Sequence, residues 1–318
     1  MSPVLSLQSP VFLFYLALAA SLLLVAGVIL AVLKWGLRAN IGQAWKAYCG
    51  WLFMVPLLIL VFFLGREAAI VFLTIVAILG FLEFACATSL YNDRIITGTV
   101  CLGIIATGGV CWINNPIDGT PGFYGLFMAL PIFMIAAILV IPVVRNRSQG
   151  QLQLLALAIV GFVYFGWMFG HVAFLANSAY AYSYLGYLVV AVELNDVAAY
   201  VFGKMFGRRP LRDNISPKKT WEGAAGGLAV SLLLPWILLS TFPHFEKWDC
   251  LFAGLIVGIG GQLGDLVVSV FKRDLGIKDM GAIIPGHGGV LDRIDSLIYV
   301  APLFFHYIRF RHDLSPPA

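Results

Sequence analysis

Long apolar segments dominate this sequence and limit what it can fold into. A membrane-spanning helix needs about 20 apolar residues, and ten segments approach that length, near residues 10–33, 47–64, 68–88, 95–113, 124–144, 152–176, 181–203, 223–242, 249–271 and 295–310. Only 11% of the residues are charged, against about 25% in soluble domains. Because lipid offers no partner to free backbone groups, the segments must be helices. The sequence therefore predicts an all-α polytopic membrane protein, a bundle of about ten transmembrane helices.

Basic residues fall in alternate loops and predict an orientation. The loops after the first, third, fifth, seventh and ninth segments hold 16 of the 20 Lys and Arg residues, whereas the alternate loops hold only Arg66 and Lys247. Since basic loops stay in the cytoplasm, the N-terminus is expected outside. Arg309 and Arg311 then lie outside too, so either they are a tolerated exception or one segment is re-entrant. Met1–Gln8 has no basic start, so the first segment is expected to be retained and not removed as a signal.

Several acids lie inside apolar segments, where each would cost about 2.5–3.5 kcal/mol if it faced lipid. Glu193 and Asp196 are three residues apart and share a helix face. They either pair with basic residues of the neighbouring loop or bind a cation or substrate. Asp265 follows a glycine-rich stretch that suits a close ligand or metal. Glu83 is the one acid within an apolar run of the first half, and we expect it near a helix end or hydrogen-bonded to a neighbouring helix.

The segment Ser269–Asp295 is the densest polar stretch of the chain. It holds four basic residues suited to phosphate oxygens, which are Lys272, Arg273, Lys278 and Arg293. A glycine-rich turn follows at residues 285–289, where backbone N–H groups can approach an anion. Asp292 and Asp295 begin the last apolar run three residues apart. Because magnesium takes one or two carboxylates plus phosphate oxygens, this composition indicates a magnesium–polyphosphate site. An ion-paired cytoplasmic loop is the alternative.

A second polar cluster precedes the eighth apolar segment. Ser216 and Thr220 can donate to phosphate, and Lys218 and Lys219 add charge. The same residues could instead form a helix start followed by cytoplasmic basic residues. Neither a GxxxxGK[ST] phosphate loop nor an HExxH zinc motif occurs in the sequence.

The dense segment resembles the signature of phosphatidate cytidylyltransferases, also called CDP-diacylglycerol synthases. That signature reads S-x-apolar-K-R, four residues, K-D, a glycine-containing stretch, H-G-G, two residues and D-R-apolar-D. Its fixed positions are filled by Ser269, Lys272, Arg273, Lys278, Asp279, His287, Gly288, Gly289, Asp292, Arg293 and Asp295. The clusters at 195–196, 216–222 and 264–265 resemble that family too, so the resemblance covers about residues 180–310.

The resemblance implies a reaction and a set of site residues. CMP would pass from CTP to phosphatidate, giving CDP-diacylglycerol and pyrophosphate in phospholipid biosynthesis. The expected catalytic residues are Asp265, Asp292, Asp295, Lys272 and Arg273, and the three aspartates are the expected ligands of one or two Mg²⁺ ions. The expected substrate-binding residues are Lys278, Asp279, His287, Gly288, Gly289, Arg293, Ser216, Lys218, Lys219, Thr220, Glu222, Asn195 and Asp196.

The expected organisation is one integral domain, with N-terminal spans at 1–178 and a catalytic part at 179–318. The expected location is a bacterial inner or cell membrane, with a cytoplasm-facing active site. The partners are CTP, phosphatidate or a related lipid phosphate, and the bilayer. A homodimer is possible, and no nucleic acid is expected. The alternatives are transfer to another lipid phosphate, an inactive lipid-binding relative, and an ion-coupled transporter that uses Glu193, Asp196 and Asp265.

Overall fold

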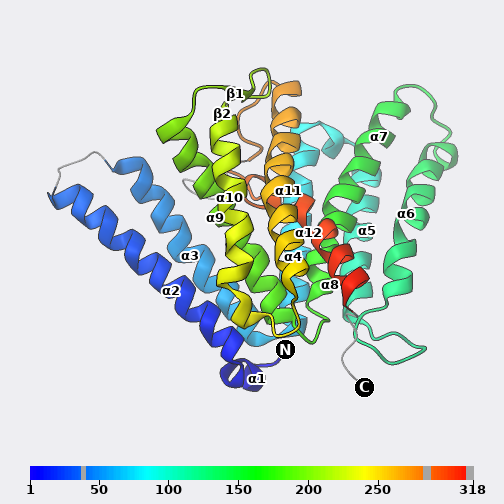
Figure 1. Cartoon of the computed structure of the whole chain (residues 1–318). Helices are drawn as coiled ribbons and strands as arrows, with labels where there is room; N and C mark the ends of the chain where they lie inside the picture. Colours follow the sequence, from blue (N-terminus) through cyan, green and yellow to red (C-terminus); the bar gives the residue numbers. More distant parts are fainter. Residues whose placement is uncertain (37–40, 282–287, 313–318) are drawn as a thin grey trace.

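The apolar segments form a helical bundle in a computed structural model that describes residues 1–36, 41–281 and 288–312 (Figure 1). The first half contains α1 (Pro3–Gln8), α2 (Pro10–Ala31), η1 (Val32–Gly36), α3 (Gly42–Leu64), α4 (Arg66–Ala87), η2 (Leu90–Asn92), α5 (Arg94–Trp112), α6 (Tyr124–Val144), α7 (Gln151–Gly161), η3 (Phe162–Met168) and α8 (Phe169–Leu175). The second half contains α9 (Ala181–Phe206), β1 (Pro210–Arg212), β2 (Ser216–Thr220), α10 (Trp221–Ile237), η4 (Leu239–Thr241), α11 (Lys247–Asp274) and α12 (Leu291–Arg311).

Each of the ten predicted apolar segments lies in helical structure, which confirms the all-α membrane fold. Within the described residues, eight helices are long and apolar enough to cross a membrane. The other two segments are α10, which has only 17 residues, and α12, which begins with charged residues. The second segment, predicted at 47–64, lies in the 23-residue α3. The sixth is interrupted by the π-helical turn η3 between α7 and α8.

Capping residues define where several helices begin. The Ser9 side chain accepts the backbone N–H of Phe12, and Pro10 follows at the first helical position of α2. Asp93 caps α5 in the same way through Ile96. At the start of α11, the Glu246 and Asp249 side chains form a reciprocal capping box. These caps satisfy N–H groups that would otherwise lack partners at a membrane surface.

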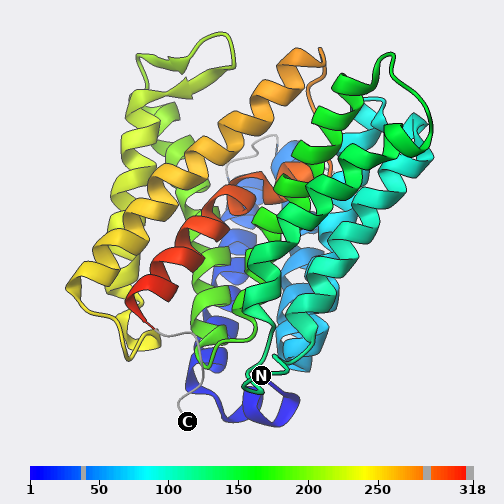
Figure 2. The same ribbon diagram turned by 90° about the vertical axis from the view of Figure 1, so that its right-hand side faces the viewer.

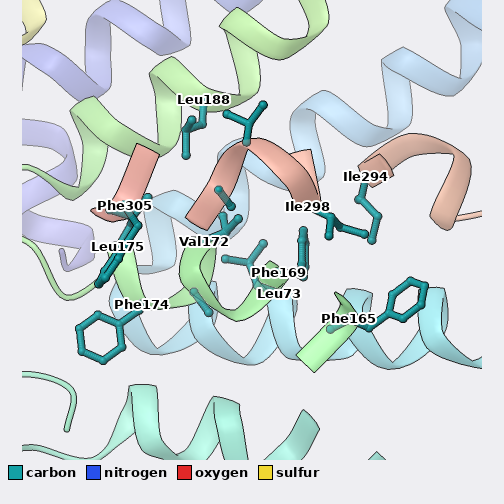
Figure 3. Packing of buried hydrophobic residues seen from close by; sticks show 14 of the residues in the cluster. Leu73, Phe165, Phe169, Val172, Phe174, Leu175, Leu188, Ile294, Ile298 and Phe305 are labelled. Atoms are coloured by element: carbon teal, nitrogen blue, oxygen red, sulfur yellow. The ribbon is translucent and has the colours of Figure 1, made fainter. Parts of the chain in front are cut away.

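The core is built around α12. Figure 3 shows Ile294, Ile298 and Phe305 of this helix packed against side chains of α4, η3, α8 and α9. These three side chains are buried. Figure 2 shows α11 beside α12, which agrees with the extensive contact between the two helices. An interior helix can begin with charged residues because protein and not lipid surrounds it.

The two ends of the bundle differ in the loops that they carry. Figure 1 places the β1–β2 hairpin and the end of α11 at the upper end, and α1 and the end of α12 at the lower end. This placement agrees with an even number of crossings. At the lower end Arg311 pairs with Glu246 at 3.0 Å and Asp249 at 3.2 Å, and Arg309 lies over the Tyr124 ring. The two arginines that conflict with the orientation rule are therefore held by local partners.

The α2–α3 pair lies at the edge of the bundle and leans away from α9 toward the upper end (Figure 1). Its lower end is fastened to the bundle by hydroxyl groups. Ser6 of α1 hydrogen-bonds Tyr182 of α9 at 2.6 Å, and Tyr15 of α2 hydrogen-bonds Thr241 at 3.2 Å. The pair therefore diverges from α9 above a fixed base.

Candidate active site

A cavity of about 1250 Å³ lies between the α2–α3 pair and helices α9 to α12. Its charged residues come from the upper halves of α9 and α11, from β2, from the segment after α11 and from the start of α12. Its apolar residues come mainly from α2, α3 and the length of α9. One cavity thus joins a charged end to an apolar end. This combination suits a ligand that has both a phosphate group and a hydrocarbon part.

The cavity brings together many of the residues that the sequence predicted. Those that line it are Asp196, Lys218, Lys219, Thr220, Asp265, Lys272, Asp279, Asp292, Arg293 and Asp295. They come from four elements and from the segment that follows α11, and they are separated by as many as 99 residues in the sequence. The proposed site is therefore a single charged pocket formed by residues distant in sequence.

The β1–β2 hairpin places two lysines over the cavity. Ser216–Thr220 forms a strand, so the alternative of a helix start at Ser216 is wrong. The helix begins at Trp221 instead. Thr220 caps this helix by accepting the backbone N–H of Gly223 at 3.1 Å. Lys219 forms an ion pair with Asp265 of α11. Arg273 of α11 donates to the backbone carbonyl of Ile215 at 3.1 Å and so fixes the turn of the hairpin.

Asp292 is held by three groups at the N-terminus of α12. One oxygen pairs with Lys272 Nζ at 2.6 Å. The other accepts the backbone N–H of Gly289 at 2.9 Å and of Met280 at 3.2 Å. Gly288 has a φ of 81°, and a Cβ there would lie 2.7 Å from the Asp292 carboxylate. The glycine turn was expected to present N–H groups to an anion, and here it presents Gly289 N–H to an aspartate.

Glu83 of α4 fixes the same segment from the other side. Its two oxygens accept the backbone N–H groups of Val290 and Leu291, each at 2.9 Å. These are N-terminal groups of α12 that have no partner within the helix. A Cβ at Gly281 or Gly289 would overlap the buried Glu83 carboxylate. The expectation that Glu83 bonds to a neighbouring helix is confirmed, and the bond connects the first half of the chain to the charged pocket.

Three carboxylates face one another across the pocket. Asp196, Asp265 and Asp295 interact electrostatically, and Lys219 offsets part of their charge. Ser296 donates to Asp196 at 3.3 Å. Within the described residues, no group of three or more acids, histidines or cysteines forms a metal cage by itself. The oxygen donors nevertheless fit a hard cation such as magnesium, which takes only one or two carboxylates when phosphates supply its other ligands.

Other predicted residues lie outside the cavity lining. Asn195 is fully buried and accepts from Ser231 of α10 at 3.2 Å, so it joins helices. Glu222 accepts the backbone N–H groups of Arg208 and Arg209 and thereby orders the basic loop. The remaining described residues outside the lining are Ser216, Arg273, Lys278, Gly288 and Gly289, of which Arg273 and Lys278 are exposed. His287 lies outside the described residues.

Comparison with known proteins agrees with this geometry. Residues 45–311 match the cytidylyltransferase family. The chain belongs to the cytidylyltransferase family. It is 37% identical over 242 residues to the phosphatidate cytidylyltransferase of Staphylococcus aureus strain COL, a match that covers 75% of this chain and 89% of that protein. The phosphatidate cytidylyltransferase of Staphylococcus saprophyticus is 36% identical over 70% of this chain and 85% of its own length. The YnbB protein of Escherichia coli K12 is 32% identical over 77% of this chain and 80% of its own length.

Membership makes this chain a CTP-using nucleotidyltransferase and a multi-pass membrane protein. The part of its pocket that sequence reasoning missed is the apolar wall. Thirteen residues of α2 and α3 line the cavity, yet in the sequence they are ordinary members of apolar runs. Lys204 and Gln262 also line it. In the sequence Lys204 is one of several basic residues of a loop, and nothing distinguishes it from the others as a pocket residue.

Proposed function

We propose that this cytidylyltransferase transfers CMP from CTP to phosphatidate, releasing pyrophosphate and forming CDP-diacylglycerol. The observation that carries the proposal is the single cavity in which a charged end adjoins an apolar wall. The names of the staphylococcal relatives support the same reaction. A lipid phosphate would place its phosphate among the charged residues and its hydrocarbon against α2 and α3.

The chemistry needs positioning and charge neutralisation more than a protein nucleophile. A phosphatidate oxygen forms a bond to the α-phosphorus of CTP. The bond from that phosphorus to the bridging oxygen of the β-phosphate breaks, and pyrophosphate leaves with the electron pair. Lys218, Lys219, Lys272 and Arg293 would offset the phosphate charges. Lys219 and Lys272 each already pair with an acid of the pocket, so both are held in place before substrate arrives.

Magnesium is the cation that this donor set suits best. Asp265 and Asp295 would hold it, and Asp292 would either join them or orient the pocket through Lys272 and its two backbone bonds. The ion would supply positive charge to the phosphates. We further propose that the charged end faces the cytoplasm, where CTP is present, because the basic loops cluster at that end.

The proposal is tested with purified protein in lipid nanodiscs. CTP and phosphatidate with magnesium should yield a CDP-lipid, whereas ATP, GTP and UTP should not substitute, and chelation should stop the reaction. Lys219→Met should lower turnover roughly 10²-fold because a charge that faces the phosphates is lost. Lys247→Met is the matched control, because Lys247 is exposed at the opposite end of α11. Product from another lipid phosphate but not from phosphatidate would replace the substrate assignment, and no nucleotide transfer at all would contradict the proposal.

A further inference from the structure

The apolar part of the cavity forms a continuous groove between three helices. Its α2 wall is Phe12, Tyr15, Leu16, Ala19, Leu22, Leu23 and Ala26, and its α3 wall is Tyr48, Trp51, Val55, Leu58, Ile59 and Phe62. The facing surface of α9 includes Val189, Val190 and Val197. α2 precedes the family match, which begins at residue 45. A helix outside the matched region therefore builds one side of this groove.

Aromatic side chains close the lower end of the groove. The Phe12 and Tyr182 rings lie 5.4 Å apart, and Tyr15 packs against Gly186 of α9. Hydrogen bonds between Ser6 and Tyr182 and between Tyr15 and Thr241 hold these rings in place. The groove therefore has a rigid floor at one end and the charged pocket at the other.

The groove is long enough to hold an acyl chain that crosses one leaflet of a bilayer. Phe12 and Ala26 both line it and are separated by roughly 21 Å along α2, from a rise of 1.5 Å per residue. Half of the hydrocarbon core of a bilayer is about 15 Å thick, and α2 is inclined to the bundle in Figure 1. A hydrocarbon chain attached to a phosphate in the charged pocket would reach from Ala26 to the aromatic floor.

We propose that this groove holds an acyl chain of the lipid substrate and that α2 sets the preferred chain length. The inference rests on the proposed function, because it takes the occupant of the charged pocket to be a lipid phosphate. Phe12 and Tyr15 limit the depth. Ala19 keeps the middle of the groove open, because a small side chain at that position leaves space between α2 and α9.

Ala19→Phe tests the proposal by filling the middle of the groove. The kcat/KM for dioleoyl phosphatidate should fall roughly tenfold, which is the size of effect by which hydrophobic pockets discriminate chain length. The kcat/KM for dihexanoyl phosphatidate should stay within about twofold of the value for the unmodified protein, because its short chains end before they reach the new phenylalanine. Ala20→Phe is the matched control: Ala20 is exposed on the same helix and does not line the cavity, so both substrates should react as with the unmodified protein. Equal loss for both substrates, or no loss for either, would overturn the proposal.

A second measurement does not depend on catalysis. Phosphatidate that carries a photoreactive group at the end of one acyl chain should cross-link near Phe12 and Tyr15. Excess unlabelled phosphatidate should compete with this labelling, and phosphatidylcholine should not. If the unmodified protein forms no CDP-lipid but this labelling pattern appears, the proposed reaction fails while the groove assignment stands. Labelling spread over the outer face of α2, or unaffected by phosphatidate, would contradict the groove assignment itself.

Discussion

The Asp292 side chain holds several parts of the charged pocket together. Its carboxylate joins Lys272 of α11 to the backbone of Gly289 and Met280. The charge of a buried carboxylate that accepts backbone N–H groups strengthens those bonds. A neutral side chain of the same shape would weaken all three contacts together.

Asp292→Asn should therefore reduce CMP transfer by at least about 10²-fold, the typical effect of removing one preorganised electrostatic group from an active site. The protein should still insert into the membrane and elute as a folded species in detergent. Asp274→Asn is the control, since Asp274 is exposed at the end of α11 and does not line the cavity. Full activity in the Asp292 variant would remove this residue from the site.

A second prediction concerns the buried Glu83 side chain. Glu83→Gln leaves only one acceptor oxygen for the N–H groups of Val290 and Leu291, and a buried donor left without a partner costs about 1–3 kcal/mol. We expect a lower melting temperature in detergent and reduced transfer activity. The variant Glu67→Gln changes an exposed acid at the start of the same helix and should alter neither. A Glu83 variant as stable and active as the unmodified protein would show that the α12 cap is dispensable.

At the level of elements, the start of α12 depends on glycines packed against carboxylates. Gly281 and Gly289 leave space for Glu83, and Gly288 leaves space for Asp292. The close approach explains glycine at these positions without invoking a bound anion. The turn and the acids therefore form one unit that sets the position of Asp292, Arg293 and Asp295 at the top of the helix.

Gly289→Ala should abolish or strongly reduce activity, because its Cβ would overlap the Glu83 carboxylate and displace the start of α12. Overpacking of this kind typically costs about 1–3 kcal/mol. Melting temperature and CMP transfer are measured together. Gly98→Ala is the comparison, because a Cβ at Gly98 in α5 would meet no atom within 4 Å. Equal behaviour of the two variants would contradict the packing argument.

Sequence reasoning predicted the elements well and their packing only in part. Apolar runs located all ten helical segments, because the bilayer imposes a length on each. Asp265, Lys272 and Asp292 could be identified because charge is unusual beside such runs. The apolar groove could not, because hydrophobic residues that face a cavity and those that face lipid have the same composition. Asn195 and Arg273 lie in segments that resemble the family, yet their side chains contact a neighbouring helix and a loop carbonyl.

The two ends of the helical bundle carry different polar clusters. The upper end has the charged pocket. At the lower end Tyr184 and His244 are hydrogen-bonded at 2.7 Å, and His312 pairs with the buried Asp249 at 3.0 Å. The His244 ring stacks on Tyr180 and lies 5.0 Å from the His312 ring. This cluster joins the loop before α11 to the end of α12.

Acid should loosen the lower end. Burial, followed by the nearby His312, lowers the pKa of His244 from 6.5 to about 4. The unfolded chain binds this proton at a higher pH than the folded protein does. The stability contributed by neutral His244 is therefore complete above the pKa of the unfolded chain and is lost as the pH falls toward the pKa of the folded protein. The melting temperature should thus drop between neutral pH and about pH 5, and His244→Gln should reduce that drop. An identical drop in both proteins would exclude His244 as its source.

The proposed reaction joins a lipid phosphate to the α-phosphorus of CTP within the cavity. Purified protein is incubated with phosphatidate, magnesium and CTP in two reactions. The CTP is radiolabelled at the α-phosphorus in one reaction and at the γ-phosphorus in the other. The α label should appear in the lipid, and the γ label should be released as pyrophosphate. Transfer of the γ label to lipid, or failure of the α label to enter the lipid, would contradict the proposed reaction.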